Sequence, residues 1–125
     1  MDKKMFCFQC EQTVGCAGCT GNAGVCGKKA DTARLQDELT GALIGLARAV
    51  DSTTAISKRT GQIIIEGLFT TVTNVNFDDA SIENMIQKVR AEKERLVPDC
   101  SKCQSSCGKT DEYDMQQLWN ANEDI

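Results

Sequence analysis

The chain has 125 residues, of which 14 are basic and 18 are acidic, so its formal net charge is −4. This length suits one small domain, and 41% hydrophobic residues are enough for a modest core of aliphatic side chains. Because phosphate backbones require a positive surface, the acidic balance argues against a nucleic-acid partner. The absence of histidine excludes mixed cysteine-histidine zinc fingers, Rieske-type clusters and Ser-His-Asp or Cys-His catalysis.

The N-terminus has no apolar run of secretory length, and the chain nowhere contains the roughly eighteen consecutive apolar residues of a membrane span. We therefore expect a cytoplasmic protein without a membrane partner. Cytosolic thiols are kept reduced, so the eight cysteines favour metal ligation or redox chemistry over structural disulfides.

Residues 1–29 are predicted to form a loop that binds an iron-sulfur cluster. Five of the eight cysteines lie between Cys7 and Cys26, and glycine occupies every third position from Gly15 to Gly27. Glycine permits backbone conformations that turn amide N–H groups toward a bound anion, here the sulfurs of a negatively charged cluster. A flexible glycine-rich linker is the alternative, but linkers do not usually carry five cysteines.

Residues 30–97 are predicted to form a three-helix bundle, so the fold class is all-α. Apolar residues recur at three- and four-residue steps over residues 31–50, 57–73 and 80–96, which is typical of amphipathic helices. The β-branched runs of the second segment also suit a strand. At 1.5 Å per residue such helices are roughly 25 to 30 Å long, so an up-down-up bundle separates the entry of the chain from its exit.

The apolar periods predict which side chains face the core. In the first helix these are Leu35, Leu39, Ala42, Leu43, Leu46, Ala47 and Val50. In the second they are Ile64, Leu68, Val72 and Val75, with Ile63, Ile65 and Phe69 widening the face. In the third they are Ile82, Met85, Ile86, Val89 and Leu96. Charged residues of the third helix, Glu92 among them, are assigned to a solvated face.

Small and polar residues mark the packing and the ends of these helices. Gly41 and Gly45 permit close approach of a neighbouring helix to the first one. Asp31 or Thr32 is expected to cap the first helix. Asp78 or Asp79 is expected to cap the third.

Residues 98–125 are predicted to form a cysteine-containing tail that leads into the start of a truncated next helix. Pro98 ends the third helix, and Cys100, Cys103 and Cys107 follow it. This tail begins at the end of the bundle opposite the loop, so we expect two separate cysteine regions. The second region provides three thiolates without an obvious fourth, which leaves free thiols, adventitious zinc and a functional metal site as alternatives.

Within the loop, Cys7 and Cys10 have a spacing that iron-sulfur, zinc and dithiol redox sites share. With Cys19 and Cys26 they provide four soft ligands, which suits a 4Fe-4S cluster with one cysteine on each iron. Thiolates alone do not exclude zinc. The alternative is therefore a structural zinc module, a binding protein and not an enzyme, whose thiolate site consists of Cys7, Cys10, Cys100 and Cys103.

Three motifs of the loop match one family closely. They are Phe6-Cys7-Phe8-Gln9-Cys10-Glu11-Gln12-Thr13, Gly18-Cys19-Thr20 and Gly24-Val25-Cys26-Gly27-Lys28, and Leu35-Gln36-Asp37 follows them. In these residues the chain resembles the N-terminus of the hybrid-cluster proteins, also called prismane proteins or hydroxylamine reductases. Residues 67–78 and 118–125 extend the likeness, so it covers nearly the whole chain.

The resemblance implies an oxidoreductase whose proximal 4Fe-4S cluster is held by Cys7, Cys10, Cys19 and Cys26. In this family the cluster relays electrons to a hybrid iron-sulfur-oxygen cluster, where hydroxylamine is reduced to ammonia or nitric oxide to nitrous oxide. The resemblance also implies that the chain is the first part of a longer enzyme, whose later domains supply the hybrid-cluster ligands, histidine included. No catalytic residue is therefore expected in this chain. The expected partners are those later domains and an electron-donor reductase or ferredoxin.

Two features depart from the family pattern. The spacing from Cys19 to Cys26 is one residue longer than in the shortest family version, which a loop containing Gly21 and Gly24 is expected to absorb. Cys16 has no counterpart and is either a spare thiol or an alternative ligand to Cys19. The match of Gly18-Cys19-Thr20 favours Cys19.

Overall fold

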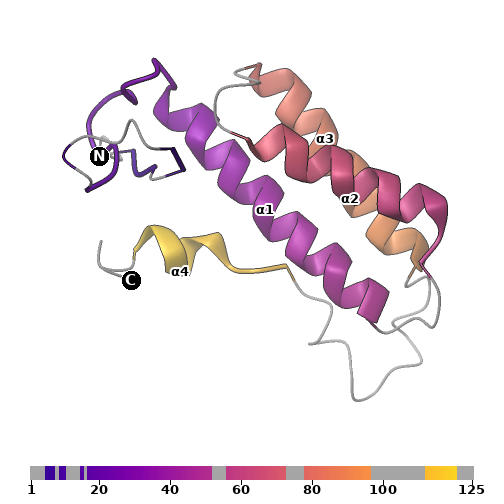
Figure 1. The fold of residues 1–125 in the computed structure, drawn as a ribbon. Coiled ribbons are helices and arrows are strands. Elements are labelled where there is room, and N and C mark those ends of the chain that lie inside the picture. The colour runs from indigo at the N-terminus through magenta and orange to yellow at the C-terminus, as the bar shows by residue number, and fades with distance from the viewer. Residues whose placement is uncertain are drawn as a thin grey trace.

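The computed structural model describes residues 5–7, 9–10, 15, 17–51, 56–72, 78–96 and 112–120. The helices within these ranges are α1 (Ala30–Asp51), α2 (Lys58–Thr71), α3 (Asp79–Leu96) and α4 (Met115–Trp119). The three long helices run up, down and up beside one another (Figure 1). The described residues contain no strand, only isolated bridges in the cysteine loop, and none of their helices is long and apolar enough to cross a bilayer. The predicted all-α three-helix bundle is confirmed.

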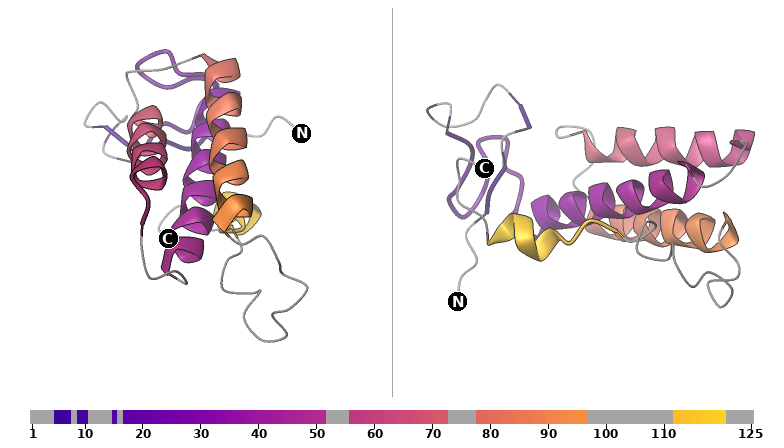
Figure 2. Two further views of the ribbon diagram at one scale, coloured as in Figure 1. Left: turned by 90° about the vertical axis from the view of Figure 1, so that its right-hand side faces the viewer. Right: turned by 90° about the horizontal axis from the view of Figure 1, so that it is seen from below.

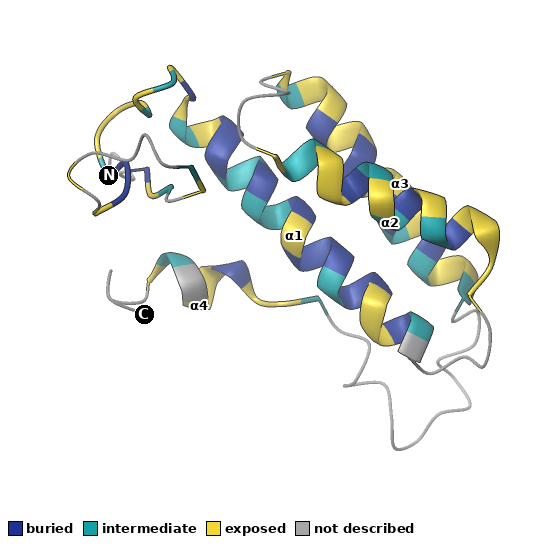
Figure 3. Ribbon diagram, viewed as in Figure 1, coloured by how far each residue is buried: buried dark blue, intermediate teal, exposed yellow. Residues whose placement is uncertain are grey.

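The core of the bundle lies where α1 faces the other two long helices. Its fully buried side chains include Leu39 and Leu46 of α1 and Ile82 and Val89 of α3, each 0% exposed. Figure 3 shows such buried positions as stripes along the facing sides of the helices. Full burial of one such side chain contributes about 1.5–3 kcal/mol relative to exposure. The apolar stripes that the sequence periodicity predicts on α1 and α3 therefore hold these two helices together.

The face of α2 that meets the bundle is only partly the predicted one: Ile63 and Ile64 do pack at the core, as predicted. Its buried residues are Thr60, Ile63 and Gly67. The predicted inward residues Leu68 and Phe69 are 54% and 62% exposed, and Val75 lies outside the described residues. The apolar side chains of Ile65, Leu68, Phe69 and Val72 lie on one side of this helix, and that side is exposed. Gly67 lies on the inward side, where a Cβ built on it would lie 2.7 Å from Leu43 Cδ2, so glycine permits this close approach of α2 to α1.

Two other predicted orientations are wrong. Ala47 of α1 is exposed, and Ala49 is buried in its place. Glu92 of α3, predicted on the solvated face, is 1% exposed and accepts a hydrogen bond from Thr60 Oγ1 at 2.7 Å. A hydrogen bond from Arg95 lowers the pKa of Glu92 to about 2, against the opposing effect of burial. The Glu92 carboxylate therefore links α2 to α3 inside the core.

Polar side chains organise the starts of the helices. Ser57 precedes α2 and caps it, since its Oγ accepts a hydrogen bond from the Thr60 amide at 3.1 Å. Asp78 directly precedes α3, where a cap was predicted, and its carboxylate accepts a hydrogen bond from a hydroxyl in the first turn. Thr32 lies inside α1, which begins earlier than predicted, and donates its hydroxyl to Asp79 Oδ1 at 2.6 Å. This bond joins the first turns of α1 and α3.

The two glycines of α1 are approached closely by the segment before α4 and by Met115, the first residue of α4, and not by a long helix. A Cβ built at Gly41 would lie 3.1 Å from the Tyr113 carbonyl oxygen, and one at Gly45 would lie 3.3 Å from Glu112 Cα. Arg90 of α3 holds the same segment through hydrogen bonds of 2.8 and 3.1 Å to the Glu112 carboxylate. The predicted close packing on α1 is confirmed, and the segment that leads into α4 provides it.

This segment and α4 lie along α1, from Gly45 back to Arg34 and toward the cysteine loop, as Figures 1 and 2 show from different sides. The short helix, five residues long, stands where the start of a further helix was predicted. The end of α3 lies at the opposite end of the bundle from the loop (Figure 1). Cys100, Cys103 and Cys107 lie outside the described residues, so the separation of the two cysteine regions stays a prediction.

Candidate metal centre

Backbone pairing brings two of the predicted ligands together across the cysteine loop. Cys7 and Cys19 form an isolated antiparallel bridge, in which the Cys7 amide donates to the Cys19 carbonyl at 3.0 Å and the reverse bond measures 2.7 Å. A second bridge joins Ala23 and Lys29 just before α1. The Gly24 amide also donates to the Lys28 carbonyl at 2.8 Å. The part of the loop that carries Cys26 is therefore tied to the start of α1.

Two glycines next to the cysteines adopt positive φ values. Gly18 has φ +90°, and a Cβ built there would lie 3.1 Å from Phe6 Cε2 and 3.3 Å from the Cys7 carbonyl oxygen. Gly27, directly after Cys26, has φ +87°. Residues with a Cβ rarely adopt such positive φ values. These glycines therefore allow the tight turns on which the positions of Cys7, Cys19 and Cys26 depend.

The thiols of Cys7, Cys10, Cys19 and Cys26 are free of disulfides. Cys19 is 6% exposed and packs in a small apolar cluster with Met5 and Ala33, whereas the other three thiols are half-buried. In the part of the chain that the structure describes, no group of three or more cysteine, aspartate or glutamate side chains is gathered closely enough to hold a metal ion. The structure thus pairs Cys7 with Cys19 but does not gather all four predicted ligands.

Of the remaining cysteines, Cys16, Cys100, Cys103 and Cys107 lie outside the described residues. The choice between Cys16 and Cys19 therefore rests on the sequence motif alone. The zinc alternative takes half of its ligands from Cys100 and Cys103, so the described residues do not test it.

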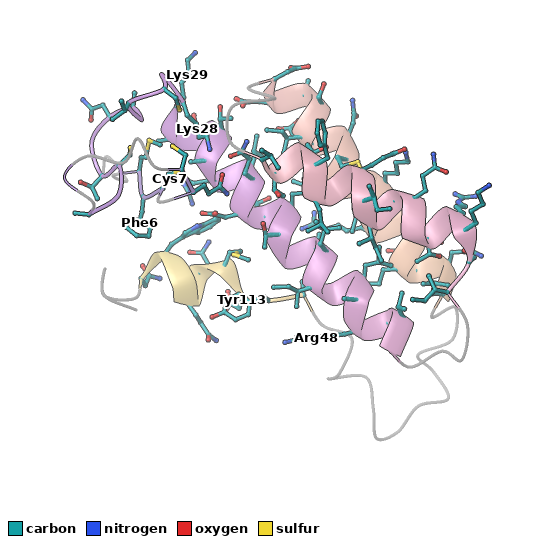
Figure 4. All side chains as sticks on the ribbon, in the orientation of Figure 1. Phe6, Cys7, Lys28, Lys29, Arg48 and Tyr113 are labelled. Atoms are coloured by element: carbon teal, nitrogen blue, oxygen red, sulfur yellow. The ribbon has the colours of Figure 1, made fainter. Side chains whose placement is uncertain are left out.

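Lys28 is a site residue to which the sequence reasoning assigned no role. It is 1% exposed, and its Nζ donates hydrogen bonds to Gln36 Oε1 at 2.6 Å, Gln9 Oε1 at 3.3 Å and Cys7 Sγ at 3.7 Å. Figure 4 shows the labelled Lys28 and Cys7 side chains next to each other at the start of α1. Lys28 and Gln36 were both part of the motifs that carried the family likeness. A lysine within a cysteine motif was the signal that could have marked this residue.

A second set of polar contacts involves Asp37, the residue that follows Gln36 on α1. The indole Nε1 of Trp119 donates to Asp37 Oδ2 at 3.0 Å, and the Arg34 guanidinium lies 4.4 Å from the centre of the Trp119 ring. Burial raises the pKa of Asp37, while the Trp119 hydrogen bond and the charge of Lys28 act in the opposite direction. This group connects α4 to the part of α1 that borders the cysteine loop.

A hollow of about 350 Å³ lies between α1, α3 and the segment before α4. Its lining includes Glu38, Arg90, Glu112 and Trp119 and contains no cysteine. All cysteine thiols of the described residues lie in the loop instead, and the chain has no histidine. Four thiols and a buried ammonium group beside one of them fit an anionic, thiolate-ligated cluster in donor chemistry and charge.

The family model described as Prismane/CO dehydrogenase family matches residues 5–125. A hydroxylamine reductase of Methanocella arvoryzae is 47% identical over 95 residues, which cover 74% of this chain and 17% of that protein. One of Acidiphilium cryptum is 43% identical over 115 residues, covering 86% of this chain and 21% of that protein. One of Methanococcus vannielii is 38% identical over 121 residues, covering 97% and 22%. The chain therefore spans about a fifth of the length of these relatives.

Proposed function

The chain belongs to the Prismane/CO dehydrogenase family, and we propose that it forms the N-terminal iron-sulfur portion of a hydroxylamine reductase. The match to relatives of that name over most of the chain supports this proposal. The substrate site, at which hydroxylamine is reduced to ammonia or nitric oxide to nitrous oxide, belongs to later domains of the parent enzyme. Those domains hold the hybrid cluster.

We assign a 4Fe-4S cluster to the loop, with Cys7, Cys10, Cys19 and Cys26 as ligands. The single observation that carries this assignment is the donor set, because these free thiols lie in one loop of a chain without histidine. When bound, the cluster relays electrons from an electron-donor reductase or ferredoxin to the hybrid cluster. Binding of a metal and folding of its loop are coupled, so we expect the ligands to gather when the cluster is inserted.

In this proposal, several contacts of the described loop residues support cluster binding. The bridge between Cys7 and Cys19 fixes the distance between two ligands through the backbone. Packing of Cys19 against Met5 and Ala33 keeps water from that thiol. Lys28 and Gln36 anchor the loop to α1 through a buried hydrogen bond of 2.6 Å. The helical bundle is thus the support on which the loop is held.

Anaerobic reconstitution tests this function. The purified chain is incubated with ferrous iron and sulfide, desalted, and analysed for iron, sulfide and zinc. We expect about four irons and four sulfides per chain and an electron paramagnetic resonance signal after reduction with dithionite. A sample whose thiols have first been alkylated is the control and should bind neither. A chain that instead retains one or two zinc ions and no sulfide would contradict the proposal.

A further inference from the structure

Lys28 connects the first and the last ligand of the loop. Its backbone follows Cys26 closely in sequence, and its carbonyl accepts the hydrogen bond from the Gly24 amide. Its side chain crosses the loop to the other end of the ligand set, where Nζ lies 3.7 Å from Cys7 Sγ. One residue therefore contacts both halves of the loop.

The ammonium group of Lys28 is held in one orientation. A lysine ammonium has three N–H donors, and its acceptors here are Gln36 Oε1, Gln9 Oε1 and Cys7 Sγ. The shortest of these bonds, 2.6 Å, goes to Gln36 on the rigid helix α1. Because the helix fixes the ammonium from one side, the remaining donor points at the cysteine sulfur.

Lys28 forms none of the ion pairs found among the described residues, although its charge does lower the pKa of the nearby Asp37 carboxyl. A buried cation is costly unless an anion or several acceptors compensate it. Two of its three acceptors are neutral amide oxygens. The third is the sulfur of a predicted cluster ligand, which becomes anionic when it binds iron. A thiolate at Cys7 therefore places a negative charge directly against one donor of Lys28, in addition to the more distant carboxylate of Asp37.

We propose that Lys28 is a positioning residue that places a fixed positive charge against the Cys7 ligand and so raises the reduction potential of the loop's cluster. The inference rests on the proposed function. Hydrogen bonds to cluster sulfurs and nearby charges set the potentials of such clusters. Reduction adds one electron, and hence one negative charge, without making or breaking a bond. A neighbouring cation stabilises the reduced cluster more than the oxidised one.

Potentiometric titration with dithionite, followed by electron paramagnetic resonance, tests this inference. The test variant is Lys28→Met, which keeps an unbranched side chain one atom shorter and removes its charge and donors. The matched control is Lys29→Met, which changes the net charge equally at an exposed neighbouring residue. Lys28→Arg restores a cation and hydrogen-bond donors. In Lys28→Met we expect the ratio of reduced to oxidised cluster at a fixed potential to fall about tenfold, which is about 59 mV for a one-electron couple.

The outcomes distinguish a failure of the proposed function from a failure of the Lys28 inference alone. Wild-type protein that takes up no iron contradicts the proposed function and this inference with it. Wild-type protein with a cluster whose potential equals that of Lys28→Met contradicts the inference alone, and so does an equal decrease in Lys29→Met. A lowered potential in Lys28→Met with wild-type values in Lys29→Met and a partial return in Lys28→Arg supports it.

A second measurement needs no cluster and no variant. The metal-free wild-type chain is alkylated with anionic iodoacetate and with neutral iodoacetamide, and modification of Cys7 is followed by peptide mass spectrometry. Both reagents attack the same thiolate, so the ratio of their rates reports the local potential. We expect this ratio at Cys7 to fall at least about threefold when the chain is unfolded in urea, because the nearby cation is then lost. An unchanged ratio would overturn the inference even where Lys28→Met does not fold.

Discussion

Glu92→Gln is a sharp test of how the bundle is held together. The Glu92 carboxylate has no exposed surface and pairs with Arg95 and with Arg59 Nε at 3.3 Å. It also accepts the Thr60 hydroxyl at 2.7 Å. Glutamine preserves the shape and the acceptor for Thr60 but removes the negative charge. The variant therefore isolates the charge of a residue that joins α2 to α3.

The pKa of Glu92 sets the size of the expected effect. A decrease from 4.5 to about 2 corresponds to at most about 3.5 kcal/mol of stabilisation, since each unit equals about 1.4 kcal/mol. Both arginine side chains are substantially exposed, at 47% and 71%, so water screens part of this interaction. We expect Glu92→Gln to lower the free energy of unfolding by about 1–2 kcal/mol at pH 7.

The sign of the pH dependence follows from the same pKa. Because the folded pKa is depressed, the charge contributes fully above about pH 4.5, and the contribution is lost as the pH falls toward about 2. Urea unfolding followed by circular dichroism at pH 7 and pH 3 measures this for both proteins. The difference should shrink by roughly half at pH 3. Glu94→Gln, at an exposed position of the same helix, is the control and should have little effect. An equal loss at both pH values would refute the role assigned to the charge.

Two further predictions concern the segment that returns along α1. Gly45→Ala should destabilise the fold by about 1–3 kcal/mol in urea unfolding, because its Cβ would lie 3.3 Å from backbone atoms of Glu112. Gly61→Ala on α2, with nothing within 4 Å, should be neutral or stabilising by up to about 1 kcal/mol, and equal losses in both variants would contradict this packing. Trp119→Phe removes the hydrogen bond that lowers the pKa of Asp37, so this pKa should rise further in carboxyl NMR titrations. An unchanged or lowered value would exclude that contact.

The periodicity of the sequence predicted most inward positions of α1 and α3, because their apolar residues recur on the faces that pack together. Leu39 and Leu46 recur on one face and are completely buried, as are Ile82 and Val89. The same reasoning failed for α2, because the apolar side that contains Leu68 and Phe69 is exposed. A close contact with another helix decided the orientation of α2, and no local pattern encodes such a contact.

The other differences from the predicted structure involve a charged residue and contacts between residues that are far apart in the sequence. Glu92 was assigned to the solvent because its partner Thr60 lies on another helix and is not recognisable from local sequence. The glycines of α1 correctly indicated a close neighbour, but only the structure identifies it as the segment around Glu112. The four cysteines proposed as ligands were chosen from spacing and resemblance, whereas the contact of Lys28 with Cys7 depends on the folded loop.

Replacement of single cysteines tests the central claim most directly, namely that the loop binds one 4Fe-4S cluster through four particular thiols. Each of Cys7, Cys10, Cys19, Cys26 and Cys16 is changed to serine, and the anaerobically reconstituted proteins are compared by iron content and by the electron paramagnetic resonance of the reduced state. We expect the first four variants to lose the signal and most of their iron, and Cys16→Ser to retain both. A full signal in Cys19→Ser together with its loss in Cys16→Ser would contradict the assigned ligand set.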